Sequence, residues 1–259
     1  MKNDSKLVAV GSVWDSNNYG RFEVVEYLDC TNVFVRFIDT GFLTKANSTS
    51  IRAGRVKDKL LPSVHGFGFI GDGGYKPSVG GVHTKPYTLW VGMLQRCYSE
   101  AFRRKNPTYK DCEVCDDWHN FQIFAEWFYE NYPDDGCKLE LDKDLKSTGN
   151  KIYSEVNCMF VPQFINAFII DAGASRGGCM IGVSWHGVKG KFMSRCNNSI
   201  ENKVEHLGAF DREIDAHLAW RKRKSELAYE LAMTQNRDEV KQALLNWKDA
   251  LDSNEIHQY

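Results

Sequence analysis

Polar side chains lie at the end of one predicted strand and on a predicted helix near the middle of the chain. The periodicity predicts strands over Lys138–Asp142 and Cys158–Val161 and a helix over Pro162–Ile170. Asp142, Lys143 and Asp144 end the first strand, and Asn166 lies on the helix. Carboxylate and amide oxygens are ligands that hard divalent cations favour, and a bound divalent cation can activate water for hydrolysis. A divalent-metal site is therefore one candidate for this segment.

Around these residues the sequence resembles the HNH-type endonucleases carried by bacteriophages, many of which are homing enzymes. The resemblance rests on Tyr87–Tyr98, Val114–Trp118, Leu141–Asp144, Gly149–Ser154 and Cys158–Pro162. It implies a ββα-metal nuclease fold that cleaves double-stranded DNA.

The resemblance also implies roles for individual residues. Asp142 and Lys143 stand where the family has an Asp-His pair, Asn157 stands at the asparagine that braces the loop, and Asn166 stands at a metal-ligand position. The implied catalytic residues are Asp142, Lys143 and Asn157, and the implied metal ligands are Asp142, Asp144 and Asn166. The expected cofactor is Mg²⁺, or Mn²⁺, because hard cations favour carboxylate and amide oxygens.

Lys143 departs from the family pattern. A protonated lysine cannot accept a proton near neutral pH, although it could stabilise charge on a phosphate. His119 is an alternative base if the fold brings it near. Three interpretations stay open: an active endonuclease, a DNA-binding regulator or inhibitor that has lost cleavage, and an exposed strand-end turn whose asparagines are caps.

A second resemblance follows in the C-terminal part. Gly182–Cys196, Glu205–Asp211 and Ile214–Trp220 resemble the APETALA-type DNA-binding domain. This resemblance implies a three-stranded sheet in the major groove, with a helix packed behind it. The expected strands are Gly182–His186, Lys191–Cys196 and Lys203–Leu207, and the expected helix is Asp211–Ala232 with Asp211 as its N-cap.

Alternation within these strands separates bulky from polar side chains. Val183, Trp185, Phe192 and Cys196 form the bulky set. The predicted DNA contacts are Ser184, His186, Lys189, Lys191, Arg195, Asn197 and Lys203, with Arg103 and Arg104 elsewhere in the chain. Arginine can bind guanine with two hydrogen bonds, and asparagine can do so with adenine. A register slip of one residue would exchange the two sets, and the alternative is that the basic residues are only solvated.

Charge is segregated along the chain, although the net charge is −1. Residues 43–110 carry +9, residues 111–145 carry −9 and residues 176–225 carry +5. Two basic blocks around an acidic one suit a protein that contacts phosphates at two places. Solvated surface is the other common explanation of such charge runs.

The overall expectation is an α+β chain of several modules. The predicted boundaries are a small Src-homology-like β-barrel at 1–70, a Gly-rich linker at 71–86, an HNH-like domain at 87–170, a linker at 171–179, an APETALA-like domain at 180–232 and a helical tail at 233–259. The barrel rests on alternation in Phe22–Tyr27 and Asn32–Phe37, and on a weaker resemblance.

Location and remaining partners follow from what the sequence lacks. It has no apolar run of about 18 residues and no secretory signal, so we expect no membrane partner and a cytoplasmic location, in the host cell if a phage encodes the chain. Cys112 and Cys115 have the spacing of half a zinc site, but a second pair is missing, which favours buried thiols. Double-stranded DNA is the expected partner, and a homodimer is left open.

Overall fold

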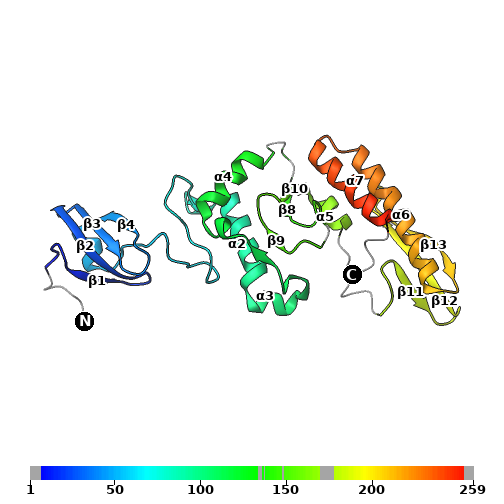
Figure 1. The fold of residues 1–259 in the computed structure, drawn as a ribbon, viewed down its shortest axis with the longest axis horizontal. Coiled ribbons are helices and arrows are strands. Elements are labelled where there is room, and N and C mark those ends of the chain that lie inside the picture. The colour runs from blue at the N-terminus through cyan, green and yellow to red at the C-terminus, as the bar shows by residue number, and fades with distance from the viewer. Residues whose placement is uncertain (1–6, 134–135, 137, 148, 170–177, 254–259) are drawn as a thin grey trace. The chain divides into compact units, whose positions relative to one another are not determined.

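The computed structural model describes residues 7–133, 136, 138–147, 149–169 and 178–253 (Figure 1). The chain divides into two compact units, Met1–Glu130 and Asn131–Tyr259. The predicted linker at 171–179 lies almost wholly outside the described residues, as does the end of the predicted C-terminal tail. Of the helices in the described part, none combines the length and the hydropathy that a membrane crossing requires.

The first unit begins with a four-stranded antiparallel sheet in the order β1-β2-β3-β4. The elements are β1 (Val13–Ser16), β2 (Gly20–Asp29), β3 (Asn32–Phe37), β4 (Leu43–Ala46) and the short helix α1 (Ser48–Arg52). Alternation buries Phe22, Val33 and Phe37 in one core. The two strands expected from alternation are confirmed.

The predicted closed barrel is not found in this sheet. Within the described residues no strand pairing joins β4 to β1, so the sheet is open. The physical reason is that the chain leaves β4 for α1 after four residues. The irregular segment after α1 meets the end of β1 instead, where the Asn17 backbone N–H donates to the Gly54 carbonyl at 2.8 Å.

Helices form the rest of the first unit. The elements are β5 (Ser78–Val79), β6 (Val82–His83), α2 (Lys85–Tyr98), α3 (Glu100–Lys105), η1 (Pro107–Tyr109), β7 (Glu113–Val114), η2 (Asp116–His119) and α4 (Phe121–Asn131). The apolar faces of α2 and α4 are buried, and the Trp90 indole donates to the Trp118 carbonyl at 2.7 Å.

Part of the predicted linker at 71–86 is packed against α4. The Gln122 amide donates to the carbonyls of Ile70 and Tyr75, both at 3.0 Å, and accepts from the Tyr75 N–H at 2.9 Å. A Cβ atom on Gly71 would lie 2.0 Å from the Asn120 side-chain oxygen, so only glycine allows this approach. The glycines therefore serve close packing, and the segment from 70 to 75 belongs to the helical part.

The second unit begins with the predicted order of strand, loop, strand and helix. The elements are β8 (Leu139–Asp142), β9 (Ile152–Tyr153), β10 (Met159–Pro162) and α5 (Gln163–Ile169). β8 and β10 are antiparallel, with Asp142 opposite Met159. This order confirms the elements predicted there, although nothing in it tests the nuclease resemblance.

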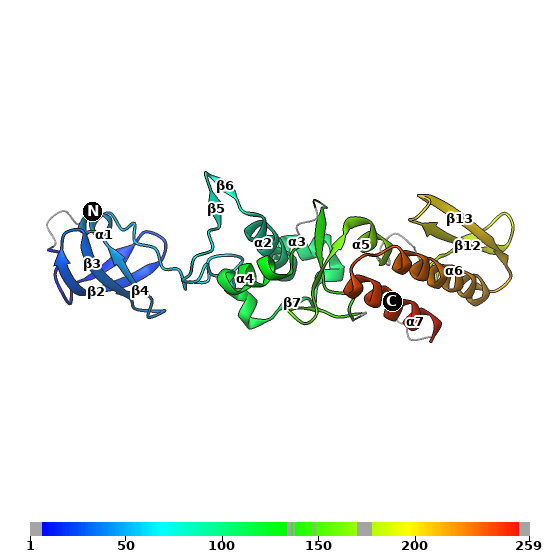
Figure 2. The same ribbon diagram turned by 90° about the horizontal axis from the view of Figure 1, so that it is seen from above.

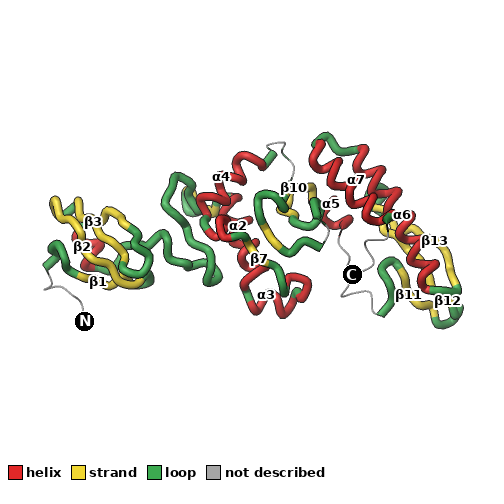
Figure 3. Tube along the Cα trace, in the orientation of Figure 1, coloured by secondary structure: helices red, strands yellow, loops and turns green. Residues whose placement is uncertain are grey.

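A three-stranded antiparallel sheet packed on two helices completes the second unit (Figures 2 and 3). The elements are β11 (Val183–His186), β12 (Lys191–Asn198), β13 (Lys203–Phe210), α6 (Glu213–Met233) and α7 (Asp238–Asp252). The predicted N-cap Asp211 is wrong, because Arg212 occupies the cap position and Asp211 pairs with Lys191 instead.

One hydrophobic core runs through the second unit. Met159, Ile165 and Phe168 of the ββα segment belong to the same buried cluster as Leu227 of α6 and Trp247 of α7. The ββα segment and the sheet with its helices, which the sequence predicts as separate modules, therefore pack on shared apolar side chains.

Candidate nucleic-acid interface and polar loop

The strand register assigns each side chain of the C-terminal sheet to one face. Val183 lies opposite Ser194, and Ser194 lies opposite Gly208, so these three share a face. Val183, Ser194 and Cys196 are buried beneath α6. Trp185 follows the same alternation but is 53% exposed, with its ring edge-to-face on Phe192 at 4.8 Å.

The other face carries polar and cationic side chains. By the same alternation it presents Ser184, His186, Lys191, Met193, Arg195, Asn197, Val204, His206 and Ala209. We call this set the outer face. The register that keeps the bulky residues inside is thus the one that the structure adopts, and five of the predicted contact residues share the outer face.

An irregularity in the pairing sets the position of Arg195. The register shifts between Ser194 and Arg195, so that Arg195 lies opposite His206 and Leu207 is the extra residue. Among the described residues, Arg195 has no side-chain hydrogen bond or ion pair, and its guanidinium is available to a ligand. His206 was missed by sequence reasoning, although its place between Glu205 and Leu207 in an alternating strand could have indicated it.

The inner face anchors the sheet to α6 through Glu205. Arg223 donates to the Glu205 carboxylate at 2.6 Å, and the Asn198 amide donates to it at 2.7 Å. The hydrogen bond from Arg223, followed by that from Asn198, lowers the pKa of Glu205 to about 2. Glu205 is thus ionised at neutral pH, where it pairs with Arg223.

The basic run Arg221–Lys224 is mostly structural. Arg221 is buried and donates to the Leu251 carbonyl, and Lys224 is buried. Arg223 forms an ion pair with Glu205. Lys222 is the member of this run with an exposed side chain. Solvated surface is therefore the wrong description for most of the run.

The other predicted DNA contacts do not belong to the outer face. Lys189 is in the turn between β11 and β12. Lys203 is the first residue of β13 and lies opposite Asn198, so it belongs to the inner face. Its ammonium pairs with Glu201. Arg103 and Arg104 belong to α3 of the first unit, where Arg104 pairs with Glu100 at 3.7 Å.

Asp142 organises the loop that follows β8. Its Oδ1 accepts the backbone N–H of Asp144 at 3.0 Å and that of Leu145 at 2.7 Å. Burial is the main cause that raises the pKa of Asp142 to about 6. The carboxylate therefore holds a turn rather than pointing freely into solvent.

Lys143 closes the same loop from inside. Its side chain is 6% exposed, its ammonium pairs with Asp144, and it donates to the Asn150 carbonyl at 2.8 Å. The Asn150 amide returns a hydrogen bond to the Lys143 carbonyl at 2.9 Å. Lys143, which stands where the family has a histidine, is thus buried and hydrogen-bonded across the loop. The interpretation as an exposed turn is wrong for this residue.

The two predicted asparagines have defined partners. The Asn157 amide donates to Asn150 Oδ1 and to the Ile152 carbonyl, both at 3.2 Å, and so braces the loop. The Asn166 amide donates to Glu140 Oε2 at 2.7 Å. Glu140 was missed by sequence reasoning, although it precedes Asp142 by two residues and shares its side of β8.

Each of the three predicted metal ligands has a partner within the protein. Asp142 Oδ1 accepts two backbone N–H groups, Asp144 pairs with the Lys143 ammonium, and the Asn166 amide N–H donates to Glu140. Among the described residues, no three His, Cys, Asp or Glu side chains are grouped so that they could bind a metal ion. A cation bound through Asp144 would compete with the Lys143 ammonium.

His119, the alternative base, lies in the first unit. Its Nε2 is 2.9 Å from the Tyr98 hydroxyl, and Phe67 packs against both rings. Burial lowers the pKa of His119, which favours the neutral imidazole at neutral pH.

No protein-family model, curated protein or solved structure matches this chain.

Proposed function

We propose that this chain binds double-stranded DNA and that the outer face of β11–β13 contacts the major groove. The observation that carries the proposal is the segregation of the sheet, with apolar side chains against α6 and Arg195, His186 and Asn197 on the opposite face. Sheets read DNA by placing such a face in a groove while the rest of the domain supports it.

Individual residues of the outer face suit different contacts. Arg195 can donate two hydrogen bonds to guanine, and Asn197 can pair with adenine. Lys189, in the adjoining turn, and Lys191 suit phosphates, which fix position and carry no sequence information. The pair between Lys191 and Asp211 is largely exposed, so a phosphate can replace Asp211 at small cost.

We expect Arg195→Ala to weaken binding to a preferred duplex by about 1–3 kcal/mol and to relax the preference at one base pair. The preferred duplex is first selected from a random pool, and fluorescence anisotropy then gives Kd. Lys222→Ala removes the same charge from the exposed side of α6 and should change Kd little. Equal losses in the two variants would contradict reading by the outer face.

Metal-dependent cleavage is the second candidate function. It is favoured by the order β8, loop, β10 and α5, which brings polar residues from strand and helix into one segment. Under this candidate, plasmid DNA is nicked in Mg²⁺ or Mn²⁺, and Asp142→Ala and Asn166→Ala lower the rate at least about 100-fold, within the range of one catalytic group. Retained duplex binding in both variants is the control. Absence of metal-dependent nicking by the unaltered chain leaves a protein that binds DNA without cutting it.

A further inference from the structure

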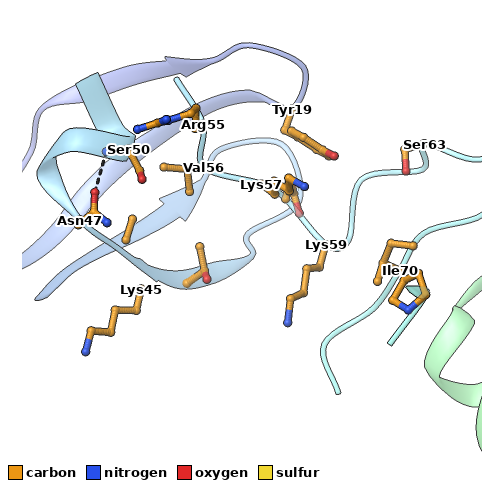
Figure 4. A pocket seen from close by; sticks show the side chains of 14 residues that line it. Tyr19, Lys45, Asn47, Ser50, Arg55, Val56, Lys57, Lys59, Ser63 and Ile70 are labelled. Atoms are coloured by element: carbon orange, nitrogen blue, oxygen red, sulfur yellow. Dashed lines mark hydrogen bonds between the residues drawn. The ribbon is translucent and has the colours of Figure 1, made fainter. Parts of the chain in front are cut away.

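A basic groove of about 470 Å³ opens on the first unit (Figure 4). Lys45 of β4 lines it together with Arg55, Lys57 and Lys59, which follow α1. Among the described residues that line it, one carries a carboxylate, Asp58. The groove lies in the block of the chain whose net charge is +9.

Exposed cationic residues alternate with buried residues in the segment after α1. Arg55 and Lys57 are exposed and Lys59 is half-buried, whereas Val56 and Asp58 between them are buried. Cationic residues therefore alternate with buried ones along this segment, and four cations line the groove.

The Asp58 carboxylate is buried and hydrogen-bonded within the protein. Its Oδ2 accepts the Thr40 hydroxyl at 2.5 Å and its Oδ1 accepts the Leu60 N–H at 2.8 Å. The side chain is 3% exposed. Asp58 thus fixes the path of the segment and offers no exposed anion to its neighbours.

The cations of the groove are largely uncompensated. Lys45, Arg55 and Lys57 form no ion pair with any residue that the structure describes. Lys59 pairs with Asp72 at 2.8 Å, but the two side chains are 43% and 69% exposed, so a phosphate can replace the aspartate. Clustered like charges of this kind attract a polyanion.

We propose that this groove is a second nucleic-acid-binding site, which holds the phosphodiester backbone independently of base sequence. A cluster of four cations suits the repeated negative charge of a phosphodiester backbone. Ser50 and Ser63 add neutral polar side chains of the type that contacts phosphates. Tyr19, which packs against the core of the N-terminal sheet, also lines the groove (Figure 4). The site belongs to a different unit from the outer face, so it stands whether or not that face binds DNA.

The test compares two double variants of the full chain. Arg55→Ala with Lys57→Ala removes two groove cations, and Arg21→Ala with Arg36→Ala removes the same charge from exposed positions of β2 and β3 outside the groove. Anisotropy with a labelled random-sequence duplex, and with its single strand, is measured across a salt series.

We expect the groove variant to bind about tenfold more weakly at low salt. The slope of log K against log salt should fall by about 1.8 if the duplex occupies the groove, or by about 1.4 if a single strand does, because each lost phosphate contact removes about 0.9 or 0.7. The control variant should keep both affinity and slope. Thermal unfolding checks that both variants are folded.

Two results would overturn the proposal: equal losses in the groove and control variants, or poly-L-glutamate competing as effectively as DNA, which would indicate an acidic protein ligand. Repeating the comparison in the Arg195→Ala background separates the two sites. If Arg195→Ala changes nothing while the groove variant does, the outer-face proposal fails and the groove proposal stands.

Discussion

Gly182→Ala is expected to lower the free energy of unfolding of the second unit by about 2–5 kcal/mol, from backbone strain and overpacking together. Gly182 has φ of +78°, and an added Cβ would lie 2.0 Å from Cγ of Trp220. Trp220 is 6% exposed in the shared core, so it cannot move aside without opening the packing of α6.

The same substitution should also weaken DNA binding. The Gly182 carbonyl accepts the backbone N–H of Arg195 at 2.9 Å. A shift at Gly182 therefore moves the residue on which we place base recognition. Urea unfolding gives the stability, and anisotropy with the selected duplex gives the loss of affinity.

Gly187→Ala is the matched control for this prediction. Gly187 lies in the turn after β11, where the nearest atom to an added Cβ is 3.9 Å away, and its φ is not in the left-handed region. Its stability should change by less than about 1 kcal/mol. If both glycine variants unfold at the same urea concentration, the close packing of Gly182 on Trp220 is not what stabilises the unit.

Lys224→Met is expected to stabilise the second unit, by up to about 3 kcal/mol at pH 7. Lys224 is 7% exposed, and its ammonium lies 3.6 Å from the centroid of the Phe168 ring and 6.0 Å from that of Trp247. Burial lowers the pKa of Lys224 to about 8. Contact of the cation with the Phe168 ring offsets part of the burial cost, so the gain should fall short of the full figure.

The pH dependence identifies the cause of this gain. The folded-state pKa of about 8 lies below the ordinary lysine value of 10.5, so the unfolded chain binds more protons between these values. The unfolding free energy of the unaltered protein should therefore rise from about pH 8 to about pH 10.5 and be flat below pH 8 with respect to this group. Lys224→Met should lack that rise, whereas Lys222→Met, on an exposed position of α6, should retain it. A rise of equal size in the Lys224→Met variant would contradict the assignment.

Periodicity predicted the elements of the second unit well. Val183 and Cys196 of the predicted bulky set are buried under α6, and the predicted helical tail contains α7. Such patterns are local, because they follow from which side of a strand or helix must be buried.

The partners of charged residues could not be predicted in the same way. Arg223 contacts Glu205, eighteen residues away, and Arg221 contacts Leu251, thirty residues away. Lys143 is buried because Asn150 supplies a carbonyl across the loop. These contacts depend on how the segments meet, and spacing along the chain carries no signal for them.

The sequence did not predict that the N-terminal sheet is open or that the glycine segment is packed, and the reason is related. Alternation predicts strands but not whether the first and last strands pair, and here Asn17 meets Gly54 instead. Glycines indicate either flexibility or close approach, and only the neighbouring Gln122 shows that close approach applies from residue 70 to 75.

The core shared by the ββα segment and the C-terminal sheet fixes the loop of Asp142 and Lys143 relative to the outer face. Phe168 of α5 and Trp247 of α7 pack at 5.4 Å between ring centroids, in the cluster that also contains Cys196 of β12. If the outer face binds DNA as we propose, any contact or nick that this loop makes on the duplex would recur the same number of base pairs from the recognised sequence.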